Sequence, residues 1–177
     1  MRIYLPATLP ALARLRDTGE VEGSPNLTAH AVTPALREWY AESDLDELEH
    51  AAFLDAERAS LRRLAADPNA ARLRIVLSAD VPDDAVQPVA GDDEDRSVVI
   101  VSGVLTLDAV ASVHVDEPHA IADVTAALAA LGGAADGDED AQFIVDSAEG
   151  HDLLWFDITE LDDLLTDLFD AHGGADE

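Results

Sequence analysis

The chain contains no cysteine and no lysine, and only 5% of its 177 residues are aromatic. Without cysteine there can be no disulfide framework, no thiolate nucleophile and no thiolate metal site. Hydrophobic residues nevertheless make up 48% of the chain, so a core is expected, built mainly from alanine, leucine and valine. This hydrophobic fraction excludes disorder along the whole length, and the chain is long enough to bury a substantial core.

Basic residues are scarce, above all in the second part of the chain. Residues 1–79 hold nine arginines against twelve acids, whereas residues 80–177 hold one arginine against twenty-six, within a net charge of −28. Such a surface repels phosphate backbones and anionic membranes and attracts cations or basic proteins. We therefore expect no binding to nucleic acid or membrane. A GC-rich genome or adaptation to high salt would each produce this composition.

Long hydrophobic runs are also missing. The longest uncharged stretches, at 97–107 and 124–135, fall short of the roughly 20 apolar residues that span a bilayer. Pro6, Pro10 and Arg14 interrupt any signal-peptide-like segment at the beginning. The sequence therefore predicts a cytoplasmic protein without a membrane span.

Turn residues and hydrophobic periodicity divide the chain into alternating strands and helices. Strands are predicted at 2–5, 27–32, 72–79, 97–104, 111–115 and 153–158. Helices are predicted at 9–17, 34–41, 43–66, 119–131 and 159–171, while 142–145 fits either type. Acidic loops are expected near 80–96 and 132–140, and a disordered tail at 172–177. The order predicts a single domain over 1–171, of the α/β or α+β class, with a mixed β-sheet and helices packed on it.

The segment 33–40 concentrates the residue types that dominate protein interfaces. Thr33 followed by Pro34 predicts a helix start, and the short helix then presents Arg37, Trp39 and Tyr40. Trp39 could instead anchor the core, with the other two at its edge. We take Arg37, Trp39 and Tyr40 as the candidate partner-binding residues.

Four potential metal ligands fall within six residues: His114, Asp116, Glu117 and His119. If 111–115 is a strand, alternation places His114 and Asp116 on one face, a workable nitrogen and oxygen pair for a divalent cation. The competing interpretation is a strand end followed by an acidic helix start, where carboxylates meet the helix dipole favourably. No recognised ligand spacing matches, so no cofactor is predicted.

The only basic concentration lies around Arg58 and Arg62, on one strip of the predicted long helix together with Asp55. These arginines would either form an anion-binding patch or pair with the acidic second part of the chain. No nucleophile elbow, P-loop or dinucleotide fingerprint occurs, which argues against an enzyme built on one of those motifs.

Four segments give the chain a resemblance that covers nearly its whole length: RIYLPAT at 2–8, AVTPALREWY at 31–40, ELE at 47–49 and HDLLWF at 151–156. Together they resemble an uncharacterised family of small actinobacterial proteins, a domain of unknown function. The resemblance implies an actinobacterial cytosolic protein and supplies no activity or catalytic residue.

The function predicted from these observations is that of a soluble acidic domain acting through protein–protein contacts, with another protein or with a second copy of itself. One alternative is a metal-dependent, hydrolase-like enzyme centred on His114, Asp116, Glu117 and His119. Another is an acidic nucleic-acid mimic that occupies a basic protein's binding site.

Overall fold

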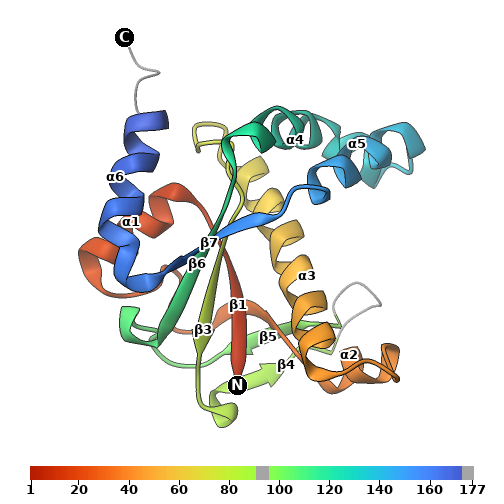
Figure 1. Ribbon diagram of the computed structural model, residues 1–177. Helices are drawn as coiled ribbons and strands as arrows, with labels where there is room; N and C mark the ends of the chain where they lie inside the picture. Colours follow the sequence, from red (N-terminus) through yellow and green to blue (C-terminus); the bar gives the residue numbers. More distant parts are fainter. Residues whose placement is uncertain (91–95, 173–177) are drawn as a thin grey trace.

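A seven-stranded β-sheet with helices on both faces forms the framework of the protein (Figure 1). The computed structural model describes residues 1–90 and 96–172. Across the sheet the strands follow the order β4 (Val86–Pro88), β5 (Val98–Val101), β2 (Leu27–Ala31), β1 (Arg2–Ala7), β3 (Ile75–Asp80), β6 (Val110–Asp116) and β7 (Leu153–Asp157). All six pairings between these described strands are antiparallel, which selects α+β from the two predicted classes.

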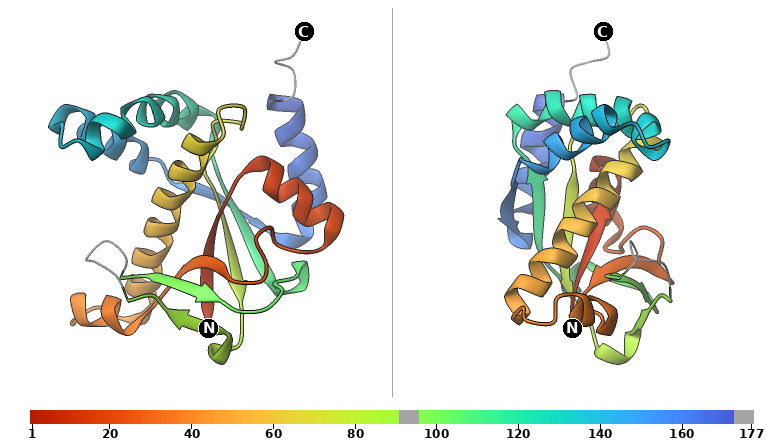
Figure 2. Two further views of the ribbon diagram at one scale, coloured as in Figure 1. Left: turned by 180° about the vertical axis from the view of Figure 1, so that it is seen from behind. Right: turned by 90° about the vertical axis from the view of Figure 1, so that its right-hand side faces the viewer.

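Different helices cover the two faces of the sheet. On one face, α1 (Leu9–Thr18) and α6 (Leu161–His172) close a core that is almost entirely aliphatic. On the other face lies the long helix α3 (Leu45–Ala66), preceded by α2 (Pro34–Trp39). The hairpin of α4 (Ile121–Ala135) and α5 (Glu139–Glu149) packs on the C-terminal part of α3. Figure 2 shows α3 running between this hairpin and α2.

Side-chain caps explain where several helices begin. Thr8 accepts a hydrogen bond from the Ala11 amide at the start of α1, and Thr33 does the same for Leu36 at the start of α2. The long helix, predicted from residue 43, has its capping box between Asp44 and Glu47. Short 3-10 helices precede β4, β6, α4 and α6, at Asp83–Ala85, Leu107–Ala109, Pro118–Ala120 and Ile158–Glu160.

The structure differs from the prediction in the acidic segments. Instead of a loop over 132–140, α4 continues through Gly132 and Gly133, and α5 begins after a short turn. The ambiguous segment 142–145 is part of α5. Within the predicted loop at 80–96 lies the edge strand β4, and residues 91–95 are outside the described part. The predicted disordered tail begins at His172, which ends α6, and its remaining residues 173–177 are also outside the described part.

The face of the sheet under α3 is unusually polar. Tyr4, Ser78, Ser112 and His114 lie on this face, because antiparallel partners point the same way and Tyr4 pairs with Ser78, which pairs with Ser112. α3 approaches the sheet through small residues such as Ala52, which is fully buried. Polar side chains of the sheet therefore remain next to this helix. No described helix combines the length and hydrophobicity needed to cross a membrane.

Candidate functional site

A cleft of about 1040 Å³ runs along α3. We call it the α3 cleft. Its ends are formed by α2 and by the α4–α5 hairpin, and side chains from β2, α3 and the segment around Arg96 complete its lining. The volume is at the upper end of the range usual for ligand sites, so several side chains of a ligand would fit.

Two exposed aromatic residues stand at the α2 end of the α3 cleft. Trp39 is 61% exposed and Tyr40 is 44% exposed, whereas Leu36 on the same short helix is buried and attaches it to the sheet. The Arg96 guanidinium lies over the Trp39 ring, 3.7 Å from its centroid, a cation–π contact. Arg37 is exposed nearby. The interpretation of Trp39 as a core anchor is therefore wrong, and the three predicted partner-binding residues are all accessible.

The Thr33 hydroxyl helps to hold this arrangement together. It donates a hydrogen bond to the carbonyl oxygen of Arg96 while it caps α2 through the Leu36 amide. A single side chain thus ties the start of α2 to the segment that carries the stacked guanidinium, which fixes the Arg96 backbone close to Trp39.

Charged side chains from α3 and α5 meet in the middle of the cleft. Arg58 donates two hydrogen bonds to the Glu149 carboxylate, at 2.7 and 2.8 Å, and one to Asp55 at 3.0 Å. Arg62 is exposed one turn further along α3 and forms no salt bridge with any described residue. The predicted pairing of arginines with the acidic second part of the chain is thus confirmed for Arg58, while Arg62 keeps its charge available.

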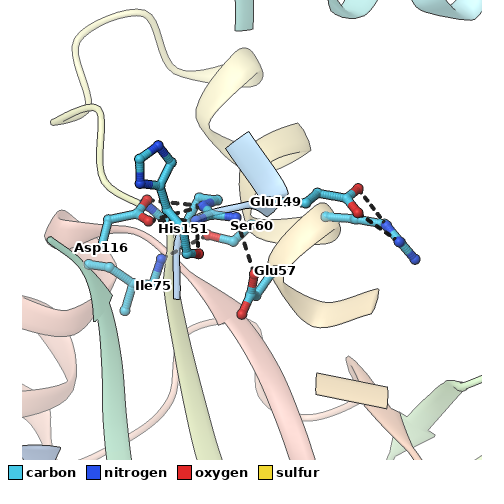
Figure 3. A network of polar contacts seen from close by, with 8 residues as sticks. Glu57, Ser60, Ile75, Asp116, Glu149 and His151 are labelled. Atoms are coloured by element: carbon cyan, nitrogen blue, oxygen red, sulfur yellow. Dashed lines mark hydrogen bonds and ion pairs between the residues drawn. The ribbon is translucent and has the colours of Figure 1, made fainter. Parts of the chain in front are cut away.

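A buried ion network closes the inner wall of the cleft (Figure 3). Arg74, which is almost fully buried, donates to both carboxylate oxygens of Asp116, to Glu57 at 3.1 Å and to the His151 carbonyl at 2.9 Å. The Ser60 hydroxyl donates a hydrogen bond to the Ala7 carbonyl oxygen and accepts one from the Ile75 amide. This geometry satisfies the buried guanidinium, as a buried charge requires.

Burial raises the pKa of Glu57 to about 7, against an ordinary value of 4.5. The positive charge of Arg74 opposes this rise and the nearby carboxylate of Asp116 adds to it. Two carboxylates facing one guanidinium would leave a net negative charge in a buried place, so Glu57 holds a proton up to near-neutral pH. Because Glu57 also lines the cleft, its charge changes there in the physiological range.

A second hydrogen-bonded chain joins His30 and Asp55, which line the cleft, through the buried Ser97. Ser97 donates to Asp55 at 2.6 Å, so it accepts at 2.9 Å from Nδ1 of His30, because a hydroxyl has one proton to give. The residue types are those of a catalytic triad. Ser97, however, is fully buried and gives its proton to the carboxylate, so this chain holds α3 to the sheet and activates no nucleophile.

The four predicted metal ligands have different neighbours. Nε2 of His114 lies 3.1 Å from the hydroxyls of both Ser78 and Ser112, and the Asp116 carboxylate is bonded to Arg74. Glu117 pairs with His119 at 2.9 Å. Within residues 1–90 and 96–172, no three His, Asp or Glu side chains gather as a metal-binding group. The structure does not bring these four together as one ligand set.

Sequence reasoning missed Glu57, Ser97 and the cleft itself. A charged residue at position 57 is one of many on a helix that looks solvated, and nothing local indicates that it faces the sheet. The one available signal was the mixture of apolar positions around the predicted long helix, which is typical of a helix covered on more than one side.

Comparison with known proteins gives a family but no activity. No curated protein and no solved structure matches the chain. Residues 1–165 match a family whose description is "Family of unknown function (DUF6912)". This match covers β1 through the first part of α6 and includes every residue of the α3 cleft. It confirms the resemblance to a domain of unknown function. The chain belongs to DUF6912.

Proposed function

We propose that the protein binds a partner protein, taking a segment of it in the α3 cleft. The observation that carries the proposal is that the consecutive residues Trp39 and Tyr40 are both exposed at the rim of the α3 cleft. Exposed tryptophan and tyrosine beside arginine are the residues that most often supply binding energy in interfaces. A rim of this kind beside an open cleft supports recognition of a protein segment.

Charge supports a specific chemistry for that segment. The cleft holds four of the ten arginines of a chain whose net charge is −28, so it is far less acidic than the remaining surface. Arg62 is exposed there without a salt bridge to a described residue. A carboxylate on the partner would find at this point an attraction that the surrounding surface does not offer.

The far wall of the cleft supports an apolar contribution next to that carboxylate. Leu61 and Ala65 of α3 line the cleft together with Leu131 and Val145 of the hairpin. The partner segment should therefore combine an acidic side chain, which reaches Arg62, with aliphatic or aromatic side chains. The volume of about 1040 Å³ accommodates several side chains of such a segment rather than one.

Selection from a random peptide library on the purified full chain tests the proposal. We expect enriched peptides to share an acidic residue beside apolar ones. Trp39→Ala should weaken their binding about thirtyfold, the effect of losing one interface hot spot. Arg62→Ala should weaken it less and should reduce its dependence on salt. Fluorescence anisotropy of a labelled peptide measures both changes.

Phe143→Ala provides a matched control, since this aromatic side chain is 73% exposed and lies outside the cleft lining. It should leave peptide affinity unchanged. Trp39 is itself exposed, so its replacement should not unfold the protein, and circular dichroism checks this. Peptides that bind the Trp39→Ala and Phe143→Ala variants equally well would refute the proposal.

The two alternative functions stay hypotheses. A metal-dependent hydrolase would have to use His114, Asp116, Glu117 and His119, of which Asp116 is already bonded to Arg74. A nucleic-acid mimic would need carboxylates in a duplex-like row, and residues 91–95 of one acidic segment are outside the described part. Neither alternative is favoured by a specific contact among the described residues.

A further inference from the structure

A second pocket, of about 410 Å³, opens on the polar face of the sheet beside the N-terminal half of α3. We call it the sheet pocket. α3 covers the middle strands and leaves this face of β6 and β7 open. The sheet pocket shares no lining residue with the α3 cleft, so its chemistry is independent of the proposed function.

Aromatic rings form the walls of the sheet pocket. Phe53 of α3 stands edge-on to Tyr4, with centroids 5.5 Å apart, and to His114, with centroids 4.7 Å apart. Trp155 of β7 pairs across the strands with His114 and is 60% exposed. An exposed indole face beside other rings is the preferred surface for an organic cation, because the ring faces carry partial negative charge.

Carboxylates of α3 stand at the rim of the same pocket. Asp46, Glu49 and Phe53 occupy one stripe of the helix by their spacing, and all three line the pocket. Neither carboxylate forms a salt bridge with a described residue. Arg2 also lines the pocket, but its guanidinium is held by both oxygens of Asp80, at 2.9 and 2.7 Å, so that pair adds little net charge.

The aromatic walls themselves carry no positive charge at neutral pH. Burial, reinforced by the neighbouring charge of Arg2, lowers the pKa of His114 to about 4. Burial and the negative charge of Glu49 raise the pKa of Tyr4 to about 12, so its phenol is also neutral. The rings of Tyr4 and His114 therefore do not oppose a bound cation, and the two rim carboxylates attract it. His50 of α3 also lines the pocket, next to Glu49 in the chain.

We propose that the sheet pocket binds an organic cation, an alkylammonium or guanidinium group, which stacks on Trp155 and Phe53 and is neutralised by Asp46 and Glu49. The cation belongs to a free amine or to a lysine or arginine side chain of another protein, since both present the same group. The net charge of −28 raises the local concentration of either one.

Titration of the ¹⁵N-labelled full chain with choline tests the proposal, with 3,3-dimethyl-1-butanol as the uncharged probe of the same shape. The protein has two tryptophans, so it gives two indole signals, which a Trp39→Phe variant assigns. We expect choline to shift the Trp155 signal in a saturable manner and to bind at least tenfold more tightly than the alcohol.

Two variants locate the cation. Trp155→Leu should weaken choline binding at least tenfold, followed at the backbone amide of Phe53. Because Trp155 is exposed, this variant should stay folded, which circular dichroism verifies. Glu49→Gln should weaken binding several-fold and flatten its salt dependence. Asp167→Asn is the matched control, because Asp167 is an exposed acid in the middle of α6 on the other face, and it should change nothing.

A second titration separates the two sources. A short peptide with one lysine is compared with the same peptide carrying norleucine. Tighter binding of the lysine peptide than of choline assigns the site to a protein side chain, and the reverse assigns it to a free amine; both support the proposal. Equal affinities for choline and the alcohol, or choline binding that is unchanged in both the Trp155→Leu and Glu49→Gln variants, would overturn it.

Discussion

At the scale of single residues, the polar interior is organised around Arg74. Its guanidinium is satisfied by Asp116, Glu57 and the His151 carbonyl, and its backbone amide also donates to Asp116. Removing one member of such a buried network typically costs about 3–5 kcal/mol, because the remaining charge loses its partner. Glu57 is the member whose charge is not needed for neutrality, and it is therefore the member that titrates.

Glu57 should make the stability of the protein depend on pH. Its pKa is about 7 in the folded protein against an ordinary 4.5, so between these values the folded state holds a proton that the unfolded chain releases. Its contribution to stability therefore falls as the pH rises from about 4.5 to about 7. Glu57→Gln mimics the protonated form and removes this loss. The free energy of unfolding of Glu57→Gln minus that of the wild type should therefore rise by about 2–3 kcal/mol from pH 5 to pH 8.

Urea unfolding of both proteins at pH 5 and pH 8 measures these free energies. Subtracting the wild-type value at each pH removes the contributions of the other carboxylates, because both proteins share them. Asp167→Asn, an exposed substitution, should show no such change with pH. Parallel stability profiles for wild type and Glu57→Gln would mean that Glu57 is ionised in the folded protein throughout this range.

At the scale of elements, local signals predicted most of the strands and helices. Thr8 and Thr33 are caps that act within three residues, so the sequence alone locates α1 and α2. The prediction was wrong at the α4–α5 hairpin, where a helix end at 131 and a loop over 132–140 were expected, although α4 continues through Gly132 and Gly133. A Cβ at position 133 would lie 3.0 Å from the Cβ of Ala141, so this glycine serves a close approach between two helices, which no local pattern reveals.

The two glycines should therefore respond differently to alanine. A Cβ at position 132 meets no atom within 4 Å, and the backbone there is helical, so Gly132→Ala should raise the free energy of unfolding by about 0.5–1 kcal/mol. At position 133 the same helix preference is opposed by the contact with Ala141, so Gly133→Ala should be neutral or destabilising. Thermal unfolding of the two variants compares them directly. Equal stabilisation would show that α4 and α5 are not closely packed at this point.

At the scale of the whole molecule, both candidate sites depend on contacts that are distant in sequence. Arg58 and Glu149 are 91 residues apart, and Arg74 and Asp116 are 42 apart. The sequence predicted the exposed residues Arg37, Trp39 and Tyr40 from their types, yet it could not predict the cleft beside them. That cleft exists only because the α4–α5 hairpin and α2 lie at opposite ends of α3. In the same way, Trp155 and Phe53 line one pocket only because the register of β6 and β7 places Trp155 opposite His114.

Photo-crosslinking from inside the α3 cleft tests the central claim most directly. A benzoylphenylalanine placed at Tyr40 in the full chain, expressed in its native host, reports what lies within a few ångströms of the rim, and the same group at Phe143 is the control. We expect one dominant crosslink from position 40, mapped by mass spectrometry to a segment with acidic and apolar residues. Its yield should fall in the Arg62→Ala variant, and the crosslink should be absent from position 143. Identical products from positions 40 and 143, or none from position 40, would contradict the assignment of the cleft as a protein-binding site.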